Sequence, residues 1–291
     1  MKKVNYILFY ILLIIFTIYI ILDTFVIKKE IKKVDNPSST SNMNKGNVKI
    51  TNNTYEDDNI KITLDEYYEN STKIYVADIN INNSKLLKTA FANNTYGKNI
   101  TKKTSEISED LNAILTINGD YYGVQEKGYV IKNGILYRSQ SRTNQEDLVI
   151  YEDGSFEIIN EDDISASELL SKGVYNLLSF GPSLLQDGKI SISKNYEVAK
   201  AMNSNPRTAI GIIDQNHYVF VVSDGRTNES EGLSLYELAE FMQKLNVKTA
   251  YNLDGGGSST MVFNGEIINN PTTNGNKISE RSVSDVVYIG Y

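Results

Sequence analysis

The sequence contains no cysteine and a single histidine among its 291 residues. The absence of cysteine excludes disulfide bonds, thiolate zinc sites and cysteine nucleophiles, and it suits an oxidising exterior. A Ser-His-Asp triad has only His217 to use, and a metal site built from several histidines is excluded. His217 lies at a predicted turn among polar residues, which is typical of a solvated side chain.

Basic residues are too few for nucleic-acid binding. Six of the 29 basic residues but only two of the 36 acidic ones lie in the first 33 positions, so the remainder carries a net charge of −11. Nonspecific nucleic-acid binding depends on neutralising phosphates with lysine and arginine, so we expect no nucleic-acid partner. The motifs GxxxxGK[ST], GxGxxG and GxSxG are also absent, which leaves nucleotide-binding folds without support.

Residues 4–27 form an almost unbroken apolar run that is long enough to span a bilayer. The run is too long for an ordinary cleaved signal, and no small-residue cleavage site follows it. We therefore expect an uncleaved single-pass anchor with basic flanks over residues 1–33. A flexible linker rich in serine and asparagine over 34–47 and one globular domain over 48–291 should follow. Lysines flank both ends of the run, so the positive-inside rule alone does not orient it.

The sequence of the domain predicts a strand-rich α+β fold. Five turn dipeptides lie between apolar runs and predict β-hairpins with mostly antiparallel pairing: Asn133-Gly134, Asp153-Gly154, Asp187-Gly188, Gln215-Asn216 and Asn264-Gly265. Helical spacing is limited to residues 105–112, 164–171 and 235–245. The pattern therefore favours mixed or antiparallel sheets with a few flanking helices.

Glu237 has a structural explanation at the start of the third helix. Ser234 and Glu237 stand three residues apart, which is the spacing of a capping box. We therefore interpret Glu237 as a cap rather than as a catalytic acid.

The stretch 251–261, YNLDGGGSSTM, has the composition of a chemical site. Three consecutive glycines lose much backbone entropy on ordering, so such a loop usually needs positive φ or close approach to another group. Successive N–H groups in such a turn can form a concave nest for anions, phosphate above all. Asp254 stands at the mouth of this loop. A glycine-rich turn capped by Asp254 is an equally good structural alternative.

Four more polar residues lie at the ends of predicted strands, where functional loops are common. Asn118 and Asp120 are followed by two tyrosines, a combination that suits the hydroxyls and faces of a sugar. Arg207 is one of only five arginines, and its planar guanidinium suits a bidentate grip on phosphate or carboxylate. Asp224 is a second candidate acid. A turn, core packing or a surface ion pair is the structural alternative for each.

Six sequence blocks, in this order, resemble the phosphodiester glycosidase family. They are INGDYYG, GPSLLQDGK, NPRTAIG, SDGRTNESEGLSLYELAEFM, NLDGGGSSTMVFNG and ERSVSDVV, and they extend from about residue 111 to residue 287. Together they form a specific pattern.

The resemblance implies hydrolysis at the anomeric carbon of a sugar joined through a phosphodiester. Substrates of this kind would be cell-surface or extracellular glycans, such as exopolysaccharide, with the domain on the extracytoplasmic side of the cell membrane. Asp254 is the first candidate for the catalytic carboxylate and Asp224 the second. The remaining matching residues are expected to bind substrate: Asn118, Asp120, Arg207, Gly255, Gly256, Gly257, Ser258, Ser259 and Arg281.

Two other interpretations stay open. The same loop would serve a surface-anchored module that binds phospho-glycans without cleaving them, because fold does not dictate function. Although the sequence requires no cofactor, Asp254, Asp224 and Ser258 could together ligate a hard cation such as Ca²⁺.

Overall fold

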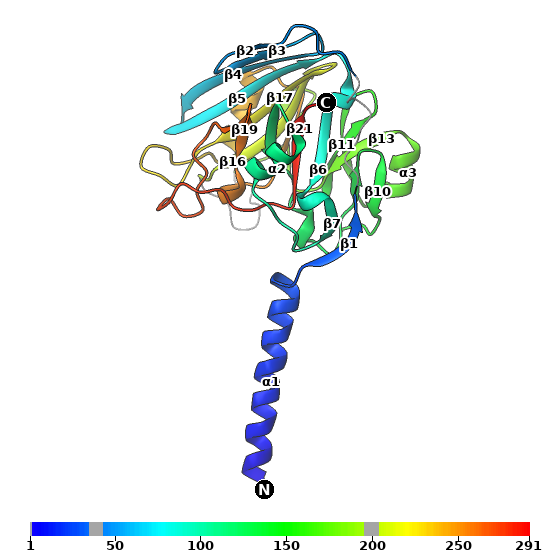
Figure 1. Ribbon diagram of the computed structural model, residues 1–291, viewed down its shortest axis with the longest axis vertical. Helices are drawn as coiled ribbons and strands as arrows, with labels where there is room; N and C mark the ends of the chain where they lie inside the picture. Colours follow the sequence, from blue (N-terminus) through cyan, green and yellow to red (C-terminus); the bar gives the residue numbers. More distant parts are fainter. Residues whose placement is uncertain (1, 35–42, 195–203) are drawn as a thin grey trace.

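The computed structural model describes residues 2–34, 43–194 and 204–291 (Figure 1). Helix α1 (Lys2–Phe25) stands out from a strand-rich domain and carries the amino terminus. Its stretch Tyr6–Phe25 is long and apolar enough to cross a membrane, and none of it is buried against the domain. This confirms the apolar amino-terminal helix, which is typical of a membrane anchor or a signal sequence. Residues 35–42 of the expected linker lie outside the described residues.

Two antiparallel sheets make up most of the domain. The larger one has nine strands, in the spatial order β15 (Lys189–Ile190), β14 (Ser183–Gln186), β18 (Thr249–Asn252), β16 (Arg207–Asp214), β17 (His217–Ser223), β5 (Thr72–Ile81), β4 (Ile60–Glu69), β3 (Thr54–Glu56) and β2 (Lys49–Ile50). The smaller one has five, in the order β20 (Glu266–Ile267), β19 (Met261–Phe263), β8 (Leu115–Asn118), β21 (Asp285–Ile289) and β6 (Leu87–Phe91).

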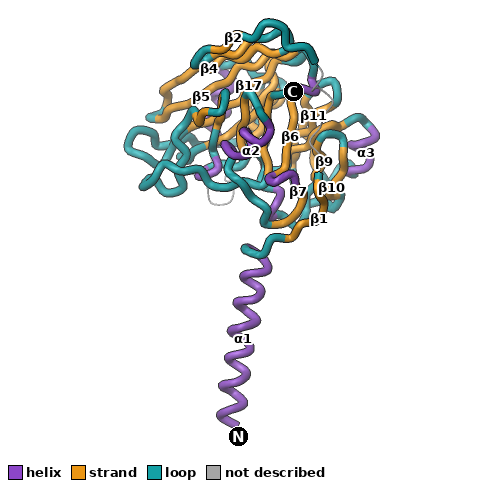
Figure 2. Tube along the Cα trace, viewed as in Figure 1, coloured by secondary structure: helices purple, strands orange, loops and turns teal. Residues whose placement is uncertain are grey.

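Smaller elements complete the domain. A three-stranded sheet has the order β12 (Phe156–Asn160), β11 (Glu146–Tyr151) and β13 (Val174–Leu178), and two strand pairs are β9 (Val130–Lys132) with β10 (Ile135–Arg138) and β1 (Lys29–Lys33) with β7 (Thr95–Lys98). The other α-helices are α2 (Thr104–Leu111), α3 (Ala166–Ser171) and α4 (Leu235–Lys244), and the 3-10 turns are η1 (Ser84–Leu86), η2 (Ala92–Asn94), η3 (Tyr122–Val124) and η4 (Gly256–Ser258). Figure 2 shows how few helices accompany the strands. The strand-rich α+β prediction is confirmed.

The core lies between the two large sheets. Because side chains alternate along a strand, one face of β16 directs Ile210 toward Ile117 of β8 in a single apolar cluster. The opposite face of the larger sheet packs on Leu238 and Met242 of α4. The outer face of the smaller sheet packs on Ile107 of α2. The domain is thus layered as helix, sheet, sheet and helix.

All five predicted hairpins form. Their strands pair as β9 with β10, β11 with β12, β14 with β15, β16 with β17 and β19 with β20. The turn residues Asn133, Asp187 and Asn264 have positive φ, as tight hairpin turns require. The capping box of Ser234 and Glu237 also forms, so Glu237 caps α4 as expected.

The connection between α1 and the domain is short and hydrogen-bonded. Only residues 26–28 separate α1 from β1, and β1 pairs at once with β7. The side-chain amide of Asn99 donates to the carbonyls of Thr24 and Ile27, at 3.0 and 3.1 Å. Residues 29–33, expected as a basic flank of the anchor, therefore form a strand of the domain. The boundaries of the three expected segments stay a prediction.

Candidate active site

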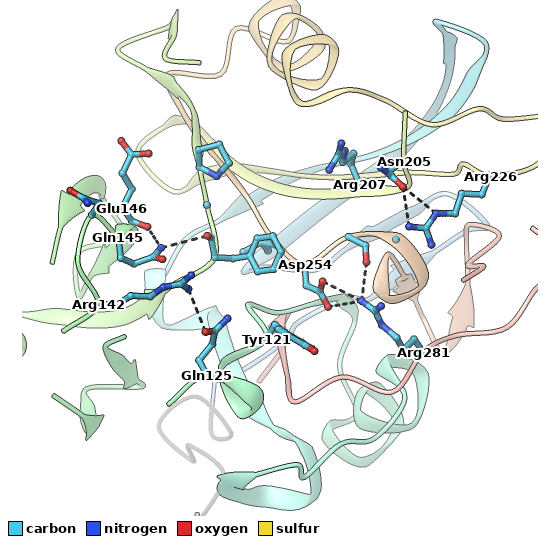
Figure 3. Close-up of a pocket in the computed structure, with 17 residues that line it drawn as sticks. Tyr121, Gln125, Arg142, Gln145, Glu146, Asn205, Arg207, Arg226, Asp254 and Arg281 are labelled. Atoms are coloured by element: carbon cyan, nitrogen blue, oxygen red, sulfur yellow. Dashed lines mark hydrogen bonds and ion pairs between the residues drawn. The ribbon is translucent and has the colours of Figure 1, made fainter. Parts of the chain in front are cut away.

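One cavity of about 660 Å³ opens where β16, β17 and β18 end together. We call it the central cavity. Four of the five arginines of the sequence line it, from separate parts of the chain: Arg142, Arg207, Arg226 and Arg281. Its lining carboxylates are Asp254 and Glu146. Figure 3 shows Asp254 between Arg281 and the opposite wall that carries Arg142 and Glu146.

Asp254 lies where the two large sheets meet. It follows β18, its backbone N–H donates to the Gly119 carbonyl at 3.3 Å, and its own carbonyl accepts from the Asn118 amide at 2.6 Å. The residue is only 8% exposed, but it lines the cavity. Burial raises the pKa of the Asp254 carboxyl above its ordinary value, while Arg281 and Ser258 act in the opposite direction. The result is a buried carboxylate held in one orientation.

Arg281 supplies most of that orientation. Its Nη2 donates to both carboxylate oxygens of Asp254, at 3.0 and 3.2 Å, and its Nε donates to Ser258 Oγ at 2.9 Å. Its backbone N–H also donates to the Gly257 carbonyl at 2.9 Å. The side chain is 42% exposed, so it faces the cavity as well as its protein partners.

Arg207 and Arg226 form a second cationic wall. Burial, together with the neighbouring positive charge of Arg226, lowers the pKa of Arg207 to about 10. Burial also lowers the pKa of Arg226, with repulsion from Arg281 as the second cause. The Nε of Arg207 donates to the Leu233 carbonyl at 2.8 Å, and Arg226 donates to Asn205 Oδ1 from Nε and Nη2. Partly buried guanidinium groups that lie this close to one another favour an anion between them.

The three glycines give the Asp254 loop its close packing. A Cβ on Gly255 would lie 2.8 Å from the Pro206 carbonyl oxygen, and one on Gly257 would lie 2.3 Å from Thr273 Oγ1. Gly256 has φ +62°, and a Cβ there would lie 3.0 Å from Arg226 Nη2. A side chain is therefore blocked by backbone at Gly255 and by Thr273 at Gly257, whereas at Gly256 it is disfavoured by the left-handed backbone and by Arg226.

The prediction of an open nest of N–H groups is wrong at three positions of the loop, Gly256, Ser258 and Ser259, because each N–H there donates to a backbone carbonyl. The backbone N–H of Gly256 donates to Pro206, that of Ser258 to Gly255 and that of Ser259 to Gly256. Gly255 and Gly256 line the cavity, whereas Ser258 reaches it only through its bond to Arg281. Ser259 is fully buried beneath the loop.

Asn118 and Asp120 lie under the site rather than in it, so the expected sugar contacts from their side chains are not what the structure shows. Asn118 is fully buried, and its Oδ1 accepts from Thr208 Oγ1 at 2.8 Å. Asp120 is 1% exposed and accepts from Lys132 Nζ and the Ser179 N–H, at 3.2 and 2.9 Å. Both side chains hold loops that border the cavity.

A buried group of three charges holds the loop after β8. Lys132 Nζ lies 3.2 Å from Asp120 and 2.8 Å from Asp285, and all three side chains are at most 1% exposed. Burial alone would lower the pKa of Lys132, but the two carboxylates outweigh it and the pKa of the lysine is raised. Burial, with repulsion from Asp120, raises the pKa of Asp285 to about 7. Two carboxylates thus share one lysine.

Asp224 is buried and does not line the central cavity. Its carboxylate accepts four hydrogen bonds, which occupy both oxygens: Asn270 N at 2.8 Å, Asn270 Nδ2 at 3.1 Å, Tyr75 Oη at 3.2 Å and Asn269 Nδ2 at 3.3 Å. This arrangement fixes the segment around residue 270 against β17. The structure therefore places Asp254, and not Asp224, at the cavity.

Several cavity residues were not singled out from the sequence. Arg142 and Glu146 lie in a loop and at a strand end whose position depends on distant strands. Tyr121, one of the two tyrosines that the sequence suggested for the face of a sugar, does line the cavity. Tyr121 has φ +67°, an unusual value for a bulky residue, and it remains 39% exposed at the cavity. Strained backbone of this kind tends to occur at functional sites.

The structure bears on two chemistries raised by the sequence, a Ser-His-Asp triad through His217 and a metal site. His217 pairs with Asp78 at 2.9 Å at the end of β17 opposite to Ser223, so it is not placed for a triad at the cavity. Within the described ranges, no three histidine or acidic side chains are grouped to hold a metal ion. Of the expected calcium ligands, Asp224 is directed to amide donors and Asp254 to Arg281.

Comparison with known proteins identifies the family. The family model for phosphodiester glycosidases matches residues 111–290. The chain is 32% identical over 177 residues to the SPbeta prophage-derived uncharacterized protein YomE of Bacillus subtilis, covering 60% of this chain and 26% of that protein. It is 31% identical over 159 residues to mouse N-acetylglucosamine-1-phosphodiester alpha-N-acetylglucosaminidase, covering 50% of this chain and 30% of the mouse protein.

A solved structure shares the fold. The catalytic domain of the zebrafish N-acetylglucosamine-1-phosphodiester alpha-N-acetylglucosaminidase superimposes with a TM-score of 0.64 at 24% identity, covering 80% of this chain and 83% of that one. The chain spans only about a quarter to a third of the length of the two curated relatives named above. Because the family model covers more than half of the chain, this protein belongs to the phosphodiester glycosidase family.

Proposed function

We propose that this protein hydrolyses a sugar-1-phosphodiester on the outer side of the membrane. The observation that carries the proposal is the central cavity, in which four arginines surround one buried carboxylate, Asp254. The mouse and zebrafish relatives are named for cleaving this kind of bond. A cavity with this charge suits a substrate that joins a sugar to a phosphate.

The reaction breaks the bond between the anomeric carbon and the phosphate oxygen. Water supplies a hydroxyl to the anomeric carbon, and the bonding electrons leave with the phosphomonoester. Ordinary glycosidases need a carboxylic acid to protonate a poor alkoxide leaving group. A phosphomonoester has its last pKa near 6, so it leaves without such help, and stabilisation of its negative charge becomes the main requirement.

In this proposal the arginines bind the phosphate and Asp254 acts at the anomeric carbon. Arg207 and Arg226 hold the phosphate from one side, while Arg281 lies between that phosphate and Asp254. Asp254 then either attacks the oxocarbenium-like centre or takes the proton of the attacking water. Its pairing with Arg281 opposes the rise in the pKa of Asp254 that burial causes.

The test is hydrolysis by the full chain in detergent micelles. We expect release of free sugar from N-acetylglucosamine-1-phosphodiesters, and no release from a matched glycoside that lacks the phosphate. Asp254→Asn is nearly isosteric and should lower kcat by about three orders of magnitude, because an amide can neither attack the anomeric carbon nor take a proton from water. Its melting curve should stay close to that of the parent.

A folded Asn variant that cleaves at the parent rate would remove Asp254 from the mechanism. Binding without any hydrolysis by the parent would favour a phospho-glycan-binding module.

A further inference from the structure

A second cavity of about 520 Å³ lies beside the first, at the end of the domain from which α1 emerges. We call it the juxtamembrane cavity, because Lys29 and Ile31 of β1 line it directly after α1. Even fully extended, residues 26–28 let β1 begin no more than roughly 14 Å from the end of α1. The bonds from Asn99 to the carbonyls of Thr24, near the end of α1, and of Ile27, just after it, fix this arrangement.

The level of the membrane follows from the length of α1. The stretch Tyr6–Phe25 has 20 residues, which at about 1.5 Å each gives roughly 30 Å, the thickness of a hydrocarbon core. Phe25 then lies at one edge of that core and β1 in the headgroup region. Figure 1 shows β1, β7 and β10 together at this end of the domain. The juxtamembrane cavity therefore faces the membrane surface.

The lining of the juxtamembrane cavity suits sugars and phosphates. Tyr137 is the half-buried aromatic residue of one wall, with its ring centroid 5.1 Å from that of Tyr96. Tyr96 and Tyr122 behind it are buried, at 7% and 1% exposed. Aromatic faces bury the apolar faces of sugar rings. The lining cations are Lys29, Lys98 and Arg138, and the one lining carboxylate is Glu126. Glu126 pairs with Lys98 at 2.7 Å, and Asp23 of α1 pairs with Lys29 at 2.6 Å, so the lining keeps a smaller net positive charge.

The two cavities are neighbours, because Gln125 lines both. Arg138 holds this boundary, since its Nη1 donates to the Gln125 carbonyl at 2.5 Å and its Nε to the Gly128 carbonyl at 2.5 Å. On the central side, the amide of Gln125 accepts from Arg142 Nη1 at 3.4 Å. The juxtamembrane cavity therefore lies next to the cavity that Asp254 lines.

We propose that the juxtamembrane cavity binds the membrane-proximal part of an anionic glycan that is attached to the same membrane as α1. This inference rests on the proposed function, because it names the class of substrate for the central cavity. The glycan enters along β1, contacts Lys29, Lys98 and Tyr137, and presents its phosphodiester to Asp254 beyond Gln125. The substrate is thus a membrane-anchored sugar phosphodiester rather than a freely diffusing one.

The experiment uses the full chain in vesicles of phosphatidylcholine, which carry no net charge. Two substrates share one N-acetylglucosamine-1-phosphodiester head group: one ends in a short soluble alcohol, the other in an oligosaccharide phosphate carried by a diacylglycerol in the same vesicles. The double variant Lys29→Gln/Lys98→Gln should lower kcat/KM for the anchored substrate by about tenfold or more, the scale of a lost charge contact. Its kcat/KM for the soluble substrate should change by less than about twofold, since the central cavity is intact.

Lys61→Gln is the matched control, because Lys61 is an exposed lysine of β4 at the far end of the domain. It should change neither value. Asn99→Ala, which releases the end of α1, should lower turnover of the anchored substrate alone. Equal loss on both substrates, or no loss on either, would overturn the inference while leaving the proposed function in place. Failure of the parent protein to cleave the soluble substrate would overturn both.

Discussion

Each arginine of the central cavity presents a planar fork that lysine cannot reproduce. Arg281 bonds Asp254 and Ser258 at the same time, and Arg207 is held at the Leu233 carbonyl through Nε. We expect Arg207→Lys and Arg281→Lys each to lower kcat/KM for a soluble sugar phosphodiester by about 10- to 100-fold, the loss of one or two charge-assisted hydrogen bonds. Steady-state kinetics beside a melting curve measure this effect. Near-parent rates in both folded variants would remove phosphate binding as their role.

Asp285 makes the stability of the domain depend on pH. Its pKa is raised to about 7 in the folded protein, above about 3.9 for an unfolded aspartate. The folded state therefore binds the proton more tightly, and this group lowers the free energy of unfolding as pH rises from about 4 to 7. We expect Asp285→Asn to give a shallower fall of Tm between pH 5 and pH 8 than the parent shows.

Comparing how steeply Tm falls with pH in the two proteins separates the titration of Asp285 from the packing effect of the substitution. The Asp285→Asn variant would lose one of the two hydrogen bonds that the carboxylate accepts from Lys132 and the Asp120 N–H, so its Tm is expected to be lower overall. Asp147 also has a pKa raised by burial, and repulsion from Glu161 adds to that rise, so some slope should remain. An unchanged slope would show that Asp285 stays ionised throughout this range.

At the scale of elements, the loop that carries Asp254 depends on close packing more than on flexibility. Gly256 and Gly265 both have positive φ, but a Cβ meets Arg226 only at Gly256 and open space at Gly265. Alanine should cost about 1–2 kcal/mol of stability at either site because of the left-handed backbone. We expect Gly256→Ala alone to lower kcat/KM, by displacing Arg226. Equal activity in the two variants would contradict this role for the loop.

Local patterns were enough to predict many of these elements. The Asn-Gly and Asp-Gly turns set a hairpin without help from distant residues, and the stripe and capping box of α4 define that helix. Strand β1 could not be predicted, because its sequence Lys-Glu-Ile-Lys-Lys shows no buried face and its partner β7 is more than 60 residues away. Pairing of this kind is decided by tertiary context.

The site was predictable to a similar degree. The composition of its loop predicted Asp254, and the matching blocks pointed to Arg207 and Arg281. Arg142 and Lys132 could not be found in the same way, because their importance comes from what lies opposite them in space. A lysine in a predicted hairpin strand gives no sign that two aspartates will bury it.

At the scale of the whole molecule, the proposal places the domain outside the cytoplasm. External protease added to intact cells should then release a fragment that contains the central cavity and leave α1 in the membrane. A cytoplasmic protein in the same cells serves as the control and should stay intact. Full protection of the domain, with digestion only after the cells are opened, would reverse the orientation. Immunoblotting of the medium and the membrane fraction measures the outcome.

The four arginines of the central cavity also affect what happens after the bond is broken. A phosphodiester carries one negative charge, whereas the phosphomonoester product carries close to two at pH 7. Under the proposed function, the same cations would therefore retain the product more strongly than they attracted the substrate, and product release would limit the rate. Inorganic phosphate shares the charge and shape of that product and would occupy the same arginines. The protein would turn over slowly wherever phosphate is abundant, and fastest where it is scarce.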